Sequence, residues 1–142
     1  MGWCLLPKPE LYPEGIDWSR LVRDRHGEVL HLSGTTDGRY RLRTALENIS
    51  PAMLRATIEK EDRWFRWHPG VNPVALFRAA WGVMTGRPAG GASTLSMQVA
   101  RMRWKLETRG VGGKLVQICR AVQLERHYSK DQILEAYFNL AP

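Results

Sequence analysis

From Ser50 to the end of the chain, apolar side chains recur every three or four positions. This spacing places them on one face of a helix, so the pattern predicts amphipathic helices, not strands. We expect about five helices in this part of the chain. Their segments are SPAMLRATIEKEDRWF (50–65), VNPVALFRAAWGVMTG (71–86), STLSMQVARMRWKLE (93–107), KLVQICRAVQLERHY (114–128) and SKDQILEAYFNL (129–140).

Capping residues and prolines mark the ends of these predicted helices. They are Ser50 with Pro51, Asn72 with Pro73 and a closing Gly86, Ser93 or Thr94, and Ser129 with Gln132 in a capping box. We expect RGVGG (109–113) to separate the third and fourth helices. In the second helix we expect one buried stripe made of Val74, Phe77, Trp81 and Met84.

The N-terminal part has a different pattern. Residues 1–18 are rich in proline and glycine and predict a leading segment without regular structure. RLVRDRHGEVLHLSG (20–34) has two short apolar runs around a glycine, which predicts a β-hairpin. The expected fold class is therefore mainly α with a small N-terminal β-hairpin segment.

Length and charge limit the classes of protein that remain. A chain of 142 residues is the size of one domain, and it contains no run of eighteen apolar residues that would span a membrane. The net charge is +7, from 21 basic and 14 acidic residues. A basic surface favours nucleic acid, phosphate-bearing substrates or anionic lipid head groups, and charge alone does not choose among them.

The segment EDRWFRWHPG (61–70) is the first candidate for chemistry. Glu61 and Asp62 stand side by side at the C-terminal end of a predicted helix. The helix dipole, the neighbouring negative charge and the nearby aromatic side chains would all raise the proton affinity of Glu61, as a general acid or base requires. The alternative is a solvated surface acid, the commoner fate of an acid at a helix end. His68, which precedes a proline, is expected only to shape the loop.

A glycine-rich turn and a set of basic residues form the second candidate. In GGASTLSMQVAR (90–101), hydroxyl side chains lie beside the start of a helix, whose free N–H groups attract anions. The basic residues Lys114, Arg120, Arg126 and Lys130 follow on the last two helices. Together they indicate a diphosphate or lipid-phosphate partner, whereas each basic residue taken alone is more simply part of a solvated face.

Three of these segments resemble successive motifs of one family. EDRWFRWHPGVNP (61–73), GGASTLSMQVAR (90–101) and HYSKDQILEAYFN (127–139) are similar, in order and spacing, to motifs of the peptidoglycan glycosyltransferases. These are the glycosyltransferase family 51 domains of class A penicillin-binding proteins, and the wording is closest to the 1C type. The resemblance implies a lysozyme-like glycosyltransferase domain over residues 19–142, incomplete at its C-terminal end.

The resemblance also implies an activity. The family polymerises lipid II into glycan strands with inversion, and Glu61 would be the general base. The substrate-binding positions would be Asp62, Arg63, Ser93, Thr94, Gln98, Arg101, Lys114, Gln117 and Lys130. The implied partners are lipid II, the growing glycan strand, the membrane surface and other cell-wall synthesis proteins, with no nucleic acid. The implied location is the periplasmic face of the bacterial cytoplasmic membrane.

The sequence departs from the family pattern in three respects. The family's third motif would begin at Lys114, between the second and last of these segments, and Gln117 stands where that motif has a glutamate. This weakens the case for a divalent cation such as Mg or Mn, so no cofactor is expected with certainty. Met97 replaces a glutamine. The sequence stops within the fourth motif, and we expect the fifth motif, the membrane anchor and the transpeptidase domain to be missing from it. Alternative functions are a catalytically incompetent domain that binds lipid-linked substrate, a basic helical nucleic-acid-binding protein, and a hydrolase that uses Glu61 as its acid.

Overall fold

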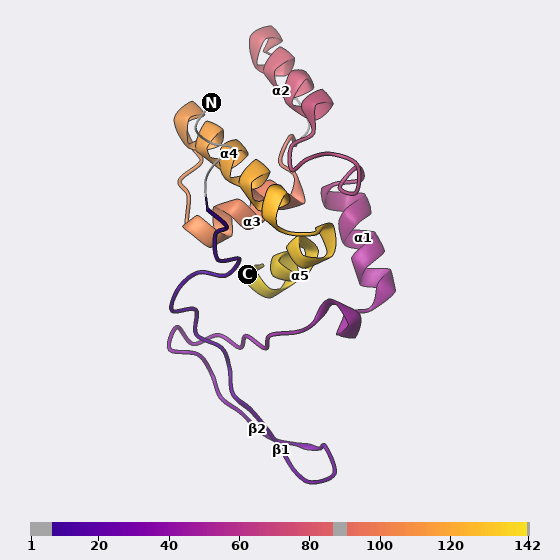
Figure 1. Cartoon of the computed structure of the whole chain (residues 1–142), viewed down its shortest axis with the longest axis vertical. Coiled ribbons are helices and arrows are strands. Elements are labelled where there is room, and N and C mark those ends of the chain that lie inside the picture. The colour runs from indigo at the N-terminus through magenta and orange to yellow at the C-terminus, as the bar shows by residue number, and fades with distance from the viewer. Residues whose placement is uncertain (1–6, 87–90, 142) are drawn as a thin grey trace.

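The computed structural model describes residues 7–86 and 91–141 of the chain (Figure 1). Two short strands come first, β1 (Leu21–Arg23) and β2 (Val29–Leu32), followed by a 3-10 helix, η2 (Leu46–Asn48). The α-helices are α1 (Pro51–Glu61), α2 (Pro73–Thr85), α3 (Leu95–Trp104), α4 (Val111–His127) and α5 (Lys130–Leu140). The predicted fold class, mainly α with a small N-terminal hairpin, is confirmed.

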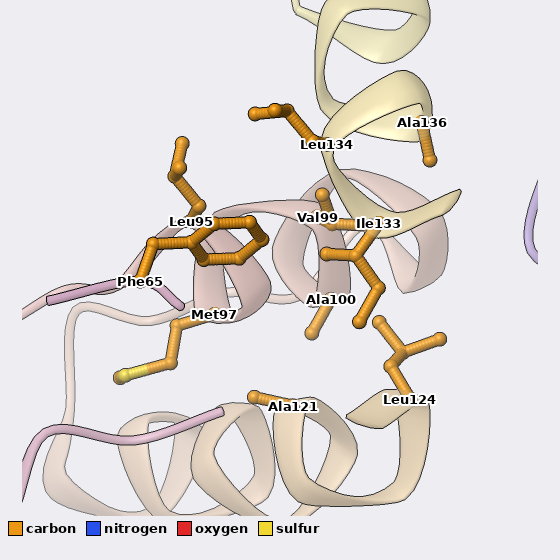
Figure 2. Packing of buried hydrophobic residues seen from close by; sticks show 10 residues of the cluster. All are labelled: Phe65, Leu95, Met97, Val99, Ala100, Ala121, Leu124, Ile133, Leu134 and Ala136. Carbon is orange, nitrogen blue, oxygen red and sulfur yellow. The ribbon is translucent and has the colours of Figure 1, made fainter. Parts of the chain in front are cut away.

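The hydrophobic core lies around α3, which packs against both α4 and α5 (Figure 2). Short apolar side chains on α3 and α4 allow the two helices to approach closely. The buried cluster consists of Phe65, Leu95, Met97, Val99, Ala100, Ala121, Leu124, Ile133, Leu134 and Ala136. Leu54 and Ile58 attach α1 to this cluster from one side. The core therefore fixes the start of α3, where two of the candidate motifs meet.

The predicted capping residues act as the sequence indicates at three helix starts. Asn72 accepts a hydrogen bond from Ala75 N, and Thr94, not Ser93, caps α3. Ser129 and Gln132 form the capping box that begins α5. Ser50 precedes α1 without a side-chain cap, and Pro51 alone marks that start.

The stripe predicted to be buried on α2 is exposed instead. The exposed fractions are 72% for Val74, 71% for Phe77, 58% for Trp81 and 81% for Met84. Figure 1 shows α2 at the far end of the molecule from the hairpin, away from the packed helices α3, α4 and α5. The predicted helix is present, but within the described residues no other element packs over its apolar face.

The boundary between α3 and α4 also differs from the prediction. Lys105 takes a left-handed conformation, φ 50°, and ends α3, so Leu106 lies beyond the helix. Gly112 and Gly113 were predicted as part of a separator, but they form the first turn of α4. A Cβ on Gly113 would lie 2.0 Å from the carbonyl oxygen of Glu107, so the glycine permits this tight connection.

The N-terminal strands form an antiparallel hairpin that projects from the helical body (Figure 1). The segment that follows returns to the helices, where Asn139 on α5 exchanges two hydrogen bonds of 2.8 Å with the backbone of Thr44. Among the residues that the structure describes, no helix is long and apolar enough to cross a membrane.

Candidate active site

An open cleft of about 610 Å³ lies between the end of α1, the loop that follows it, α2 and the start of α3. Five of the predicted site residues line it, namely Glu61, Asp62, Arg63, Ser93 and Thr94. The first two candidate motifs, which begin 29 residues apart in the sequence, therefore form one site. Two further predicted positions contact lining residues: Gln98 bonds to Glu61, and Lys114 bonds to Ser93. Lys130 lies away from the cleft.

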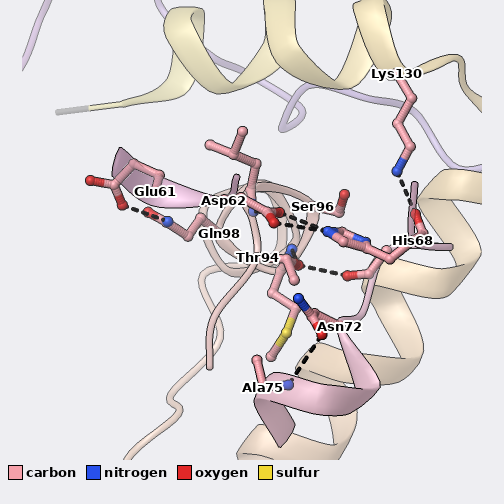
Figure 3. Close-up of polar contacts among 12 residues, drawn as sticks. Glu61, Asp62, His68, Asn72, Ala75, Thr94, Ser96, Gln98 and Lys130 are labelled. Atoms are coloured by element: carbon pink, nitrogen blue, oxygen red, sulfur yellow. Dashed lines mark hydrogen bonds and ion pairs between the residues drawn. The ribbon is translucent and has the colours of Figure 1, made fainter. Parts of the chain in front are cut away.

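Glu61 is the last residue of α1 and is partly exposed at the wall of the cleft. Gln98 on α3 donates a hydrogen bond of 3.0 Å from Nε2 to Glu61 Oε2. Figure 3 shows the second carboxylate oxygen pointing away from Gln98. The aromatic neighbours Trp64 and Trp67 line the same cleft but are 59% and 83% exposed. The sequence predicted that they would desolvate Glu61, and in this structure they leave the cleft open.

Asp62 is buried and joins three segments of the chain (Figure 3). Both of its carboxylate oxygens lie 2.9 Å from Nε2 of His68, which is also buried. Oδ2 also accepts a hydrogen bond of 3.0 Å from the backbone N–H of Leu95, one of the free donors at the start of α3. Asp62 therefore holds the end of α1 and the loop against the start of α3.

The loop is fixed at a second point by Thr94 and Gly70. Thr94 Oγ1 donates a hydrogen bond of 2.6 Å to Gly70 O and accepts one from Met97 N. Gly70 has φ +88°, and a Cβ there would lie 2.8 Å from the carbonyl oxygen of Ala121 on α4. The prediction that His68 shapes the loop is confirmed by its bond to Asp62 (Figure 3).

A basic group stands beside the hydroxyl of Ser93. Lys114 on α4 donates from Nζ to Ser93 Oγ at 2.8 Å and to Gln117 Oε1 at 2.9 Å. Burial, and after it the positive charge of Arg101, lowers the pKa of Lys114 from its ordinary value. Arg101 is exposed on α3 and close enough to Lys114 for the two charges to repel. The structure thus brings the predicted basic positions Arg101 and Lys114 together.

Tyr137 on α5 connects this basic pair with the acid. Its pKa is raised, first by burial and then by the negative charge of Glu61, and Arg101 opposes this shift. A single phenol therefore experiences the charges of both Glu61 and Arg101. Glu61 and Arg101 therefore act on the same phenol with opposite sign.

Two predicted substrate-binding residues have other partners. Arg63 is exposed and pairs with Glu59 one turn earlier on α1, through Nε at 2.6 Å and also through Nη2. Lys130 donates to His68 O at 2.6 Å and to Glu125 Oε1 at 2.7 Å, as Figure 3 shows for the first of these bonds. Lys130 lines a separate hollow behind the loop, not the cleft at Glu61. Its contacts join α5 to the loop.

Sequence reasoning missed Glu125. Its side chain is only 7% exposed, and it accepts hydrogen bonds from Lys130 and from Ser96 on α3. Glu125 thereby ties α3, α4 and α5 together directly behind the loop that contains Gly70. The available signal was the predicted start of a helix at Ser129, because Glu125 and Lys130 then lie on either side of the connection between two helices.

Fold and site together define a helical domain in which Glu61 lines an open cleft and Lys114 bonds to Ser93, another residue of the cleft lining. Comparison with protein-family models identifies the family. The model described as Transglycosylase matches residues 26–142, so the chain belongs to the transglycosylase family.

Several penicillin-binding proteins are similar to the chain. The chain is 45% identical over 138 residues to penicillin-binding protein 1C of Escherichia coli K12, which covers 96% of the chain and 17% of that protein. It is 38% identical over 100 residues to penicillin-binding protein 1A of the same organism, covering 70% of the chain and 12% of the relative. For penicillin-binding protein 1A/1B of Bacillus subtilis the identity is 30% over 123 residues, covering 86% and 13%. The chain thus spans less than a fifth of the length of each of these relatives.

Proposed function

We propose that this domain is a peptidoglycan glycosyltransferase that polymerises lipid II into glycan strands, with Glu61 as the general base. The observation that carries the proposal is the position of Glu61. It lies at the wall of an open cleft, oriented by Gln98, and one residue before the buried link between Asp62 and the start of α3. Membership of the transglycosylase family supports the reaction type.

In the proposed reaction, the 4-hydroxyl oxygen of the acceptor sugar attacks the anomeric carbon of the donor. The bond from this carbon to the diphosphate oxygen breaks, and its electron pair leaves with the lipid diphosphate. Glu61 takes the proton of the attacking hydroxyl. Attack and departure on opposite faces invert the configuration at the anomeric carbon.

Charge near the leaving group is the second requirement. Negative charge develops on the diphosphate as the bond breaks, and fixed positive groups stabilise it without reorganisation. Lys114, which bonds to Ser93, is one such group, and Arg101, whose charge acts on Lys114, is a second. The net charge of +7 and the open apolar face of α2 suit an anionic membrane surface, where the lipid-linked substrate would be presented. This surface would be the periplasmic face of the cytoplasmic membrane.

The test is polymerisation of labelled lipid II in detergent by the purified chain and by Glu61→Gln. Glu47→Gln is the matched control, because Glu47 is an exposed carboxylate on η2 outside the cleft. We expect polymer from the parent and from the control. Loss of general-base catalysis should reduce the rate of Glu61→Gln by about 10²- to 10⁴-fold. Equal rates for Glu61→Gln and the parent would overturn the assignment of the base.

A further inference from the structure

Gln117 occupies an internal position of the site, and both ends of its amide are engaged. Its side chain is 2% exposed. Nε2 donates a hydrogen bond of 2.6 Å to Met97 O in α3, and Oε1 accepts one of 2.9 Å from Lys114 Nζ. A carboxylate in the same place would set one of its oxygens against the Met97 carbonyl, where two acceptors repel. The amide is therefore the group that fits this position in its present geometry.

A divalent cation does not fit this arrangement. Mg²⁺ and Mn²⁺ favour carboxylate oxygens, and the amide nitrogen of Gln117 has no lone pair to offer. Its amide oxygen already faces an ammonium group, which would repel a cation. Among residues 7–86 and 91–141, no group of three or more histidine, cysteine, aspartate or glutamate side chains is placed to hold a metal ion.

The positive charge at the site is not neutralised by a carboxylate. Within the described part of the chain, neither Lys114 nor Arg101 forms an ion pair. The two groups repel each other, and Lys114 is held in place by neutral oxygens, those of Ser93 and Gln117. An anion that binds at Lys114 relieves this repulsion without displacing any protein carboxylate.

We propose that the basic site at Lys114 and Arg101 holds a diphosphate group directly, without a divalent cation. Gln117 is the residue that makes this possible. By placing a neutral oxygen on Lys114, Gln117 positions the ammonium without neutralising it. The inference rests on the proposed function for its natural ligand, the lipid diphosphate of the donor. It is nevertheless a statement about anion binding that can be tested without the transfer reaction.

The experiment measures binding of inorganic pyrophosphate to the whole chain by isothermal titration calorimetry, with EDTA present and with Mg²⁺ in its place. We expect the parent chain to bind pyrophosphate in EDTA. Lys114→Met should lose at least about tenfold in affinity, since it removes a charge-assisted contact. Gln117→Glu should also weaken binding in EDTA at least about tenfold, because its carboxylate pairs with Lys114 and competes with the anion.

Gln123→Glu is the matched control on the same helix. Gln123 is also buried, donates to a backbone carbonyl, that of Pro7, and accepts from a basic side chain, that of Arg120. We therefore expect Gln123→Glu to change the stability of the fold about as much as Gln117→Glu does. It should leave the affinity for pyrophosphate in EDTA unchanged. Circular dichroism of each variant shows whether it is folded.

Three outcomes would overturn the inference. They are a parent chain that binds pyrophosphate only with Mg²⁺, a parent chain that does not bind it at all, and a folded Gln117→Glu variant with parental affinity in EDTA. The first two do not depend on any variant being folded. Binding as expected, together with no polymer from lipid II, would leave this inference standing and remove the proposed function instead.

Discussion

Replacing Gly70 by alanine tests how the loop after α1 is held against α4. Gly70 has φ +88°, and the added Cβ would lie 2.8 Å from Ala121 O and 2.9 Å from Glu125 Cγ. Ordinary carbon contacts lie at about 3.5–4.0 Å, so the loop and α4 would have to separate by more than half an ångström. Both atoms belong to the region that supports the cleft, and the helix backbone cannot yield as a flexible side chain would.

Two effects add in this substitution. An L-residue in the left-handed region costs about 1–2 kcal/mol. Overpacking at a tight contact costs about 1–3 kcal/mol more. We therefore expect Gly70→Ala to lower the free energy of unfolding by about 2–5 kcal/mol.

Gly27→Ala is the matched control, because Gly27 has nearly the same backbone angle, φ +87°, with nothing within 4 Å of an added Cβ. It should lose only the conformational part, about 1–2 kcal/mol or less. Urea denaturation followed by circular dichroism measures both. Equal losses for the two variants would refute the reasoning, since the close approach to α4 would then contribute nothing.

Three further predictions concern the buried link, the acid and the exposed helix. Asp62→Ala should lower the free energy of unfolding by about 3–5 kcal/mol, because it leaves His68 and the N–H of Leu95 without their partner. Asp131 forms an exposed ion pair with Arg66, so Asp131→Ala should cost less than about 1 kcal/mol in the same urea experiment. Glu61→Gln should lower the pKa of Tyr137, because the carboxylate charge that raises it is removed. The measurement is an NMR titration of labelled tyrosine rings, and the absence of a downward shift would contradict the effect of Glu61 on Tyr137. Trp81→Ser should change stability by less than about 0.5 kcal/mol, and a loss of about 3–5 kcal/mol would show that α2 is buried after all.

Local signals in the sequence predicted the helices well because they act within a few residues. The cap of α2 by Asn72 and the left-handed Gly86 at its end follow from rules that need only neighbouring positions. Gly113 shows the limit of such rules. A glycine pair reads as a break between helices, and only the approach of the Glu107 carbonyl shows why a glycine lies inside α4.

The error on α2 has a different physical cause. Periodicity establishes that Phe77 and Trp81 share a face, but burial requires a second surface to cover that face. Such a surface is a property of the tertiary structure, and the pattern within one helix carries no information about it. On α3, by contrast, Leu95 and Val99 are buried, because α4 and α5 pack there.

For the site, the motifs identified the right residues but not their partners. Asp62 was predicted to bind substrate, and its bond to the N–H of Leu95 joins positions 33 residues apart. A sequence does not show which backbone N–H group a side chain will bind, because every residue except proline has one. Gln117 was noticed only as a departure from a family pattern, and its bond to the Met97 carbonyl gives that departure a structural reason.

The pair of adjacent acids at the end of α1 can be explained by the direction of the chain there. Asp62 leaves the helical conformation, with φ −161° and ψ 74°, so the two side chains point to different places. Asp62 binds Leu95 N and Glu61 accepts from Gln98, and these two partners lie one turn apart on α3. The buried Asp62 therefore sets the distance between the partly exposed Glu61 and the amide of Gln98 that orients it. A change at Asp62 must alter the position of Glu61 as well as stability, and its effect on the reaction should not add independently to that of a change at Gln98.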